Sequence, residues 1–236
     1  MDHVRALLRS ARSVAALTGA GVSAESGIPT FRGANGLWKQ YRPEDLATPE
    51  AFARNPELVW KWYDWRRGII AQAKPNAGHT ALAELEQRVP DFTLITQNVD
   101  DLHDDAGSRR ILKVHGSIWT VRCVGCGREN VDRRAPLPEI PPRCQCGALL
   151  RPGVVWFGEP LPSTVWNEAE RAAERAEVFL VIGTSALVYP AAGLAATAKR
   201  AGANLVEINI AETPLSQSID AFLKGSSAEL LPQLMG

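Results

Sequence analysis

Four cysteines in one short stretch of the chain have the spacing of a metal site. They form a CxxC pair and a tighter CxC pair, and the sequence contains no other cysteine. Thiolates bind zinc tetrahedrally, and two cysteine pairs separated by about 17 residues are typical of zinc ribbons. Four thiolates leave no coordination position for a catalytic water, so we predict one structural zinc ion in preference to free thiols. The predicted ligands are Cys123, Cys126, Cys144 and Cys146.

Polar residues that follow apolar segments could carry acid–base chemistry. His115, in VHGS, follows a short apolar segment and precedes a glycine. An imidazole has an unperturbed pKa of about 6.5 and suits a general base near neutrality. Gln97, Asn98 and Asp100, in TQNVDD, follow another apolar segment. Open α/β sheets bind ligands at the carboxyl ends of their strands, so we expect both groups to face one crevice. The alternatives are a structural histidine and an ordinary turn.

The glycine-rich segment GAGVSAESGIPTFRG, residues 19–33, predicts a dinucleotide site. Gly19, Gly21 and Ala24 match the pattern GxGxxG/A after an apolar segment, where glycines allow backbone amides to approach a pyrophosphate. Dehydrogenases usually carry an acidic residue at the end of the second strand. Here that strand ends in Thr-Gln-Asn, so we expect a dinucleotide to bind in a different pose.

A tryptophan-rich segment, WKWYDWRRGII, could bind a carboxylate. On a helix, Tyr63 and Arg66 would share a face, and a phenol and a guanidinium that point at one spot can both donate hydrogen bonds to a carboxylate. The alternative is an amphipathic helix with buried aromatic residues and with Arg66 and Arg67 in solvent. We expect Asp64 to pair with Arg67 rather than with Arg66, because helical spacing brings the first two together.

Short apolar segments that alternate with helical patterns predict the fold that positions these residues. Strands that are apolar on both faces and alternate with helices indicate an α/β fold, with a Rossmann-like parallel sheet covered by helices on both sides. The predicted strands are 13–17, 92–96, 111–115, 178–183 and 204–209, and the predicted helices are the N-terminal segment, 79–89, 164–177 and 189–202.

Two insertions interrupt this alternation and are predicted to form a smaller lobe. The first is rich in Trp and Arg, and the second carries the cysteines and a proline-rich segment. A short polar insert has little core of its own and needs a staple such as zinc. We predict a Rossmann-like NAD-binding domain at 1–33, 76–116 and 153–236, a helical module at 34–75 and a zinc-binding module at 117–152.

The composition excludes some partners. The 236 residues carry 26 basic and 26 acidic side chains, so no overall field favours nucleic acid or an anionic membrane. No segment approaches the run of about 18 apolar residues of a membrane span. The arginine-rich N-terminus resembles a transit peptide, but we interpret it as the first helix of the fold, because the glycine-rich segment follows closely. Clustered cysteines suit a reducing compartment, so we expect a cytoplasmic protein.

The set of motifs resembles the sirtuins, the NAD-dependent protein lysine deacylases. The resemblance rests on the glycine-rich segment, TQNVD, the HG pair, the two cysteine pairs, VVWFGE, GTS and EIN, in the family's order. It implies a large Rossmann-type domain and a small lobe of helical and zinc modules, with NAD and the acyl-lysine of a protein substrate in the cleft between them. NAD would be consumed as a co-substrate, which accounts for the missing acidic residue. The shortened CxC pair departs from the family pattern and leaves the zinc geometry open.

The resemblance also implies roles for the matching residues, with His115 as the base. The pair Tyr63 and Arg66 resembles the signature of the class III branch, which removes succinyl, malonyl or glutaryl groups, and it predicts weaker activity on acetyl-lysine. The implied cofactor-binding residues are Gly19, Ala20, Gly21, Ser23, Ala24, Phe31, Arg32, Gln97, Asn98, Asp100, Gly183, Thr184, Ser185, Asn209 and Ser227. The implied substrate-binding residues are Tyr63, Arg66, Val154, Phe157, Gly158 and Glu159.

In the family's reaction, the acyl oxygen attacks C1 of the nicotinamide ribose and nicotinamide leaves. The base then deprotonates a ribose hydroxyl, and the acyl group moves from lysine to the sugar. The products are free lysine, nicotinamide and O-acyl-ADP-ribose. Two alternatives remain open from the residues: an NAD-dependent protein mono-ADP-ribosyltransferase, and a non-catalytic zinc-ribbon protein that senses or binds NAD. The balanced charge argues against direct nucleic-acid binding.

Overall fold

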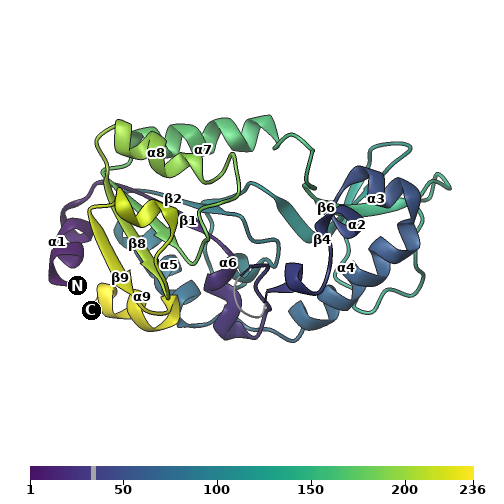
Figure 1. The fold of residues 1–236 in the computed structure, drawn as a ribbon, viewed down its shortest axis with the longest axis horizontal. Coiled ribbons are helices and arrows are strands. Elements are labelled where there is room, and N and C mark those ends of the chain that lie inside the picture. The colour runs from purple at the N-terminus through teal and green to yellow at the C-terminus, as the bar shows by residue number, and fades with distance from the viewer. Residues whose placement is uncertain (33–35) are drawn as a thin grey trace.

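A six-stranded parallel sheet forms the centre of the larger lobe (Figure 1). The computed structural model describes residues 1–32 and 36–236. The strand order is β3-β2-β1-β7-β8-β9. The strands are β1 (Ser13–Thr18), β2 (Asp91–Thr96), β3 (Ile111–Lys113), β7 (Val178–Ile182), β8 (Asn204–Asn209) and β9 (Ala221–Lys224). The predicted parallel α/β fold is therefore confirmed.

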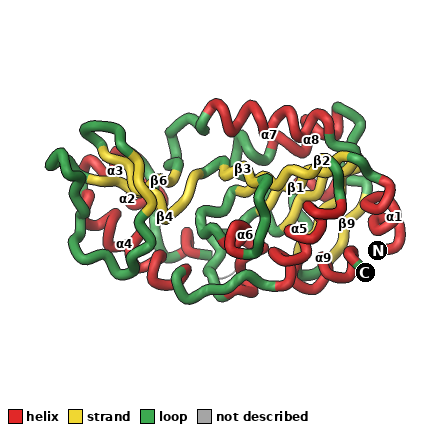
Figure 2. The backbone as a smooth tube through the Cα atoms, turned by 180° about the vertical axis from the view of Figure 1, so that it is seen from behind, coloured by secondary structure: helices red, strands yellow, loops and turns green. Residues whose placement is uncertain are grey.

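Helices cover both faces of this sheet (Figures 1 and 2). Alternate residues of β1 point to opposite faces, so Val14 and Ala16 pack in one core and Ala15 and Leu17 in the other. The first core is closed by α1 (Asp2–Ser10), α5 (Ala77–Arg88) and α9 (Ser227–Met235). The second is closed by α7 (Ser163–Arg175) and α8 (Gly193–Arg200).

The smaller lobe combines a three-stranded antiparallel sheet with short helices, and it lies beside the carboxyl ends of the large sheet (Figure 1). Its strand order is β5-β4-β6. The strands are β4 (Gly116–Cys123), β5 (Glu129–Val131) and β6 (Leu150–Val154), and the helices are α2 (Pro43–Leu46), α3 (Pro49–Arg54) and α4 (Pro56–Ile70). Aromatic side chains from α4, β4 and the segment after β6 share one buried core.

Helix α4 buries both of its arginines. Asn55 caps the start of the helix, because its side chain accepts the backbone N–H of Leu58 at 3.0 Å, and Pro56 occupies the first turn. Trp60 is fully buried, and Arg66 and Arg67 are 6% and 0% exposed. The alternative in which both arginines cover a solvated face is therefore wrong.

The structure differs from the sequence predictions at several ends of elements. The helix predicted at 189–202 begins at Gly193, since the residues before it form a turn around Pro190, which has no N–H for a helical hydrogen bond. The short strand β9 was not predicted. The remaining elements are η1 (Ala20–Ser26), η2 (Leu37–Lys39), α6 (Leu102–Asp105) and η3 (Pro214–Gln217). Within 1–32 and 36–236, every helix is too short or too polar to cross a bilayer.

Candidate active site

Three loops meet where β1, β2 and β7 end. Thr18 is the register partner of Thr96 on one side and of Ile182 on the other. Each of these residues is followed at once by one of the polar segments predicted to bind a dinucleotide. Strands β2 and β3 continue the sheet to one side of β1, and β7 to β9 continue it to the other. The loops therefore lie at the topological switch point, where open α/β sheets bind ligands.

The glycines of the first loop allow close packing against the loop after β7. A Cβ atom on Gly19 would lie 2.8 Å from Thr184 Cβ, and one on Gly21 would lie 2.7 Å from the carbonyl oxygen of Gly183. The backbone N–H of Gly21 donates to that same oxygen at 2.8 Å. In this structure the requirement for glycine thus comes from contact between two loops of the protein.

A hydrogen-bond network links the first two loops through the buried hydroxyl of Ser23. Nδ1 of His79 accepts the backbone N–H of Asn76, so its Nε2 carries the proton and donates to Ser23 Oγ at 3.3 Å. Ser23 Oγ also accepts Asn98 Nδ2 at 3.3 Å and donates to Asp100 Oδ2 at 2.8 Å. Because every member has a partner, Ser23, Asn98 and Asp100 are held as one unit.

Burial controls the protonation of this network. Burial raises the pKa of Asp100, while hydrogen bonds from Leu102 and Ser23 oppose the shift. Burial lowers the pKa of His79 to about 4 and that of His103 to about 3. His103 lies against His79, and its Nε2 is 3.0 Å from Thr18 Oγ1. Both imidazoles are therefore neutral near pH 7.

His115 presents one unprotonated ring nitrogen. It follows β3, and its Nδ1 lies 3.1 Å from the backbone carbonyl oxygen of Gln97. A carbonyl only accepts, so Nδ1 carries the proton and Nε2 remains free to take one. Burial lowers the pKa of His115, and the Gln97 hydrogen bond partly offsets this effect. The geometry suits a general base at neutral pH.

The loop after β7 is joined to its neighbours by side-chain hydrogen bonds. Gln97 Nε2 donates to Thr184 Oγ1 at 3.1 Å, and Asn209 Nδ2 donates to the Thr184 carbonyl oxygen at 2.8 Å. Ser185 is half-buried beside them. Ser227, at the start of α9, is buried, and its hydroxyl lacks a hydrogen-bond partner among the described residues.

The remaining predicted cofactor residues lie along or after η1. Ala20 is half-buried at its start and Ala24 is exposed. Phe31 is half-buried, and its ring lies 5.1 Å from that of Trp38. Arg32 is exposed. The last residue of the glycine-rich motif, at position 33, lies outside the described residues.

Tyr63 and Arg66 lie in the aromatic core of the smaller lobe. Tyr63 is 2% exposed, and its hydroxyl oxygen accepts the indole N–H of Trp156 at 2.9 Å. The Arg66 guanidinium carbon lies 4.5 Å from the centre of the Phe31 ring and 5.1 Å from that of Trp62. A guanidinium over aromatic faces is attracted by their quadrupoles.

The predicted substrate-binding segment after β6 runs between the two lobes. Val154 pairs with Gly116, and the N–H of the next residue, Val155, donates to the His115 carbonyl oxygen at 3.0 Å. Phe157 is 43% exposed, and Gly158 has a left-handed φ of 87°. The Glu159 carboxylate is already paired with Arg151, whose Nη2 lies 2.9 Å from its Oε2. The carboxylate also accepts the backbone N–H of Trp156, so in this structure Glu159 fixes the conformation of its own segment.

The cysteine cluster has the dimensions of a tetrahedral zinc site. The four Sγ atoms all lie within 4.8 Å of one another, with Cys123–Cys146 at 3.4 Å and Cys126–Cys144 at 3.8 Å. Zinc–sulfur bonds of about 2.3 Å place tetrahedral sulfurs about 3.8 Å apart. Gly147, with φ of 89°, turns the chain directly after the CxC pair. The cluster therefore fits the predicted structural zinc despite the shortened spacing.

Two features of the site were missed or mispredicted from the sequence. His79 carries no local signal of its role, although Asn76 and His79 form a capping box that could have marked the start of α5. The expected pairing of Asp64 with Arg67 is wrong. Asp64 accepts the backbone N–H of Leu137 at 2.8 Å, and Arg67 donates to the carbonyl oxygen of Ile118 at 3.0 and 2.8 Å. Packing of α4 on the smaller lobe decides both partners.

The sequence is similar to that of known protein deacylases. A model of the Sir2 family matches residues 19–190 of the chain. An NAD-dependent protein deacylase of Aquifex aeolicus is 57% identical over 213 residues, which cover 90% of this chain and 89% of that protein. An NAD-dependent protein deacylase 2 of Pyrobaculum aerophilum is 53% identical over 234 residues, which cover 99% and 94%.

Solved structures of Sir2 homologues have the same fold as this chain. A Sir2 homologue in complex with NAD has a TM-score of 0.94 and 51% identity, over 99% of this chain and 92% of that one. A variant Sir2 homologue in complex with 2′-O-acetyl ADP ribose has a TM-score of 0.93 and 51% identity, over 99% and 94%. The chain therefore belongs to the Sir2 family, and it is a sirtuin-type NAD-dependent protein deacylase.

Proposed function

We propose that this deacylase removes succinyl and malonyl groups from lysine side chains of proteins, and acetyl groups more slowly. The observation that carries the proposal is the Arg66 guanidinium, which is 6% exposed and has no carboxylate partner within 4.0 Å among the described residues. A buried cation costs free energy unless it is paired. The distal carboxylate of a succinyl or malonyl group is a partner of the right charge.

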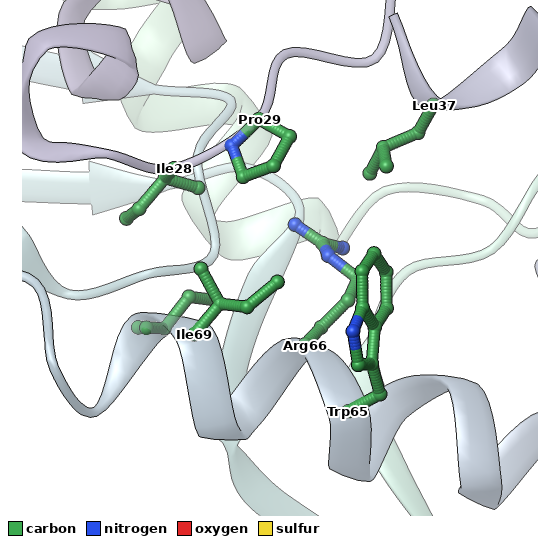
Figure 3. Close-up of a pocket in the computed structure, with 7 residues that line it drawn as sticks. Ile28, Pro29, Leu37, Trp65, Arg66 and Ile69 are labelled. Atoms are coloured by element: carbon green, nitrogen blue, oxygen red, sulfur yellow. The ribbon is translucent and has the colours of Figure 1, made fainter.

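The surroundings of Arg66 support this proposal. Burial lowers the pKa of Arg66, whereas Tyr63 and Asp100 act in the opposite direction. The guanidinium points away from α4 toward the segment that carries Pro29 (Figure 3). The side chains that line the narrow gap beside it are otherwise apolar apart from the indole of Trp65, so a carboxylate that enters between them would find few competing donors. This gap is narrower than a water molecule, and it is lined by Ile28, Pro29, Leu37, Trp65, Arg66, Ile69 and Ile70.

Tyr63 supports the same assignment through its hydrogen-bond inventory. Its oxygen accepts the Trp156 N–H, and this orientation leaves the phenolic proton available to donate. Burial raises the pKa of Tyr63 to about 12, so the phenol keeps that proton at neutral pH. A neutral donor and a cation on one helix face suit an anionic acyl group better than an acetyl group.

We also propose roles for the remaining residues in the reaction. NAD supplies the glycosidic bond that is broken and the ribose that receives the acyl group. His115 takes a proton at Nε2, which its Nδ1 hydrogen bond to Gln97 leaves free. Asn98 and Asp100, held by Ser23, bind the nicotinamide end. The loop that carries Thr184, together with the other predicted cofactor residues, binds the phosphates and the adenosine.

Matched peptides test the proposal. One lysine in a fixed sequence is succinylated, malonylated or acetylated, and nicotinamide release with NAD is measured for each peptide. We expect the succinyl and malonyl peptides to have a kcat/KM roughly 10- to 150-fold above that of the acetyl peptide. A clear preference for acetyl would refute the proposal. Label transferred from NAD to protein, instead of to O-acyl-ADP-ribose, would indicate ADP-ribosyl transfer.

A further inference from the structure

The zinc-bearing sheet of the smaller lobe contacts the backbone of the loop that carries Asp100. The backbone N–H of Ile118, on β4, donates to the Val99 carbonyl oxygen at 2.9 Å. The indole N–H of the next residue, Trp119, donates to the Asp100 carbonyl oxygen at 3.2 Å. Trp119 is 4% exposed, so little water competes for this bond. The peptide unit after Asp100 is therefore anchored from outside the larger lobe.

Two guanidinium groups hold the Trp119 ring. The Arg67 and Arg133 carbons each lie 5.7 Å from the ring centre. Arg67 is itself fixed, because it is fully buried and donates twice to the Ile118 carbonyl oxygen. We call Arg67, Trp119 and Arg133 the Trp119 stack. Its members come from α4, from β4 and from the segment after β5, so it joins the helices of the smaller lobe to the zinc-bearing sheet.

The peptide that the indole holds is in an unusual conformation. Asp101 has a left-handed φ of 64°, which costs free energy for a residue with a side chain. Its carboxylate is held by Lys113 at 2.8 Å and by Arg133 at 3.5 Å. Arg133 thus contacts both the ring of Trp119 and the side chain of Asp101. These contacts stabilise one orientation of the Asp100–Asp101 peptide, and with it the direction of the Asp100 side chain toward Ser23.

We propose that Trp119 is a positioning residue for NAD cleavage, through its hydrogen bond to the Asp100 backbone. The inference rests on the proposed role of Asp100 at the nicotinamide end. The zinc-bearing sheet then does more than stabilise the fold, since it sets the position of a loop in the larger lobe. Without the indole N–H, the Asp100 carbonyl loses this donor, and the backbone that carries the Asp100 carboxylate is held less tightly, although Ser23 and Leu102 still donate to the carboxylate.

The variant Trp119→Phe tests this directly, because it keeps an aromatic ring in the stack and removes the N–H. Trp60→Phe is a matched control: Trp60 is also buried in the smaller lobe, and its indole donates to the Leu150 carbonyl oxygen at 2.7 Å, with no bond to the Asp100 loop. We expect both variants to lower Tm by similar amounts and to keep their zinc. Only Trp119→Phe should lower kcat and the rate of nicotinamide exchange, by roughly tenfold to a hundredfold, with KM for an acetyl-lysine peptide unchanged.

Equal exchange rates in the two variants would overturn the proposal, as would an exchange rate of Trp119→Phe within about twofold of wild type. If Trp119→Phe does not fold, Arg133→Gln provides the test, with Arg134→Gln as its control. Arg133 is exposed enough to replace, and Arg134 pairs with Asp132 instead. Arg133→Gln should slow exchange about threefold or more while Arg134→Gln does not; equal rates would again refute the proposal. Because exchange is measured with an acetyl peptide, a failure of the anionic-acyl proposal would leave this result unaffected.

Discussion

Replacement of Arg66 by methionine separates acyl selectivity from stability. Methionine keeps a long unbranched side chain and removes the cation. A hydrogen bond to a charged group contributes about 1.5 to 3 kcal/mol, which corresponds to roughly 10- to 150-fold in kcat/KM. We therefore expect Arg66→Met to lower kcat/KM for a succinyl-lysine peptide by that factor. Activity of the variant on the acetyl peptide should stay within about twofold of wild type, because an acetyl group has no carboxylate that could bind the guanidinium.

The same variant should change the stability of the protein very little. Loss of the ring contacts to Phe31 and Trp62 costs roughly 0.5 to 2 kcal/mol each. Removal of a desolvated cation that has no carboxylate partner among the described residues acts in the opposite direction. The net change in the free energy of unfolding should be within about 2 kcal/mol. Urea denaturation of wild type and variant measures it.

The neighbouring arginine supplies the control. Arg67 is also buried, but it donates two hydrogen bonds to the Ile118 carbonyl oxygen and does not line the narrow gap beside Arg66. Arg67→Met should destabilise the fold by about 1 to 3 kcal/mol and lower turnover of succinyl and acetyl peptides by the same factor. If Arg66→Met also lowers both peptides equally, or neither, the carboxylate assignment is refuted.

The histidines and the cysteines lead to further predictions. His115→Tyr should abolish formation of O-acyl-ADP-ribose from either peptide and keep the zinc content, because the base acts after nicotinamide has left. The acid limb of the wild-type pH profile should lie below about pH 6.5, because burial lowers the pKa of His115. A limb at pH 7 or above would contradict the assigned base. His79 and His103 have folded pKa values of about 4 and about 3, so each protonates first in the unfolded chain. The stability that they contribute is complete above about pH 6.5 and should fall by about 1.4 kcal/mol per pH unit for each histidine as the pH falls toward 4. Urea denaturation at pH 7 and pH 5 measures the slope, and His103→Gln should reduce it by about half. Cys144→Ser should lower both zinc stoichiometry and Tm, and a chelator should do the same to wild type, with recovery on added zinc; full stability without zinc would exclude a structural metal.

The local patterns of the sequence determined the fold class and the family. Apolar segments such as the one at 92–96 predict buried strands because burial on both faces selects the same residue types wherever a covered parallel sheet forms. The glycine-rich turn, the cysteine pairs and the strand-end position of His115 are equally local, so neighbouring residues alone indicate NAD, zinc and a base. The prediction that Tyr63 and Arg66 share one face of a helix came from helical spacing alone.

Only the tertiary structure decided which partners these groups have. Ser23 forms a hydrogen bond with His79, which lies 56 positions away in the sequence. The indole of Trp119, on a strand of the other lobe, donates to the Asp100 carbonyl oxygen. Helical spacing predicted an ion pair between Arg67 and Asp64, but in the packed structure Arg67 donates to the carbonyl oxygen of Ile118 on β4. Contacts of this kind depend on how elements pack, and a buried donor takes whichever acceptor the packing brings near it, so no periodicity along the chain encodes them.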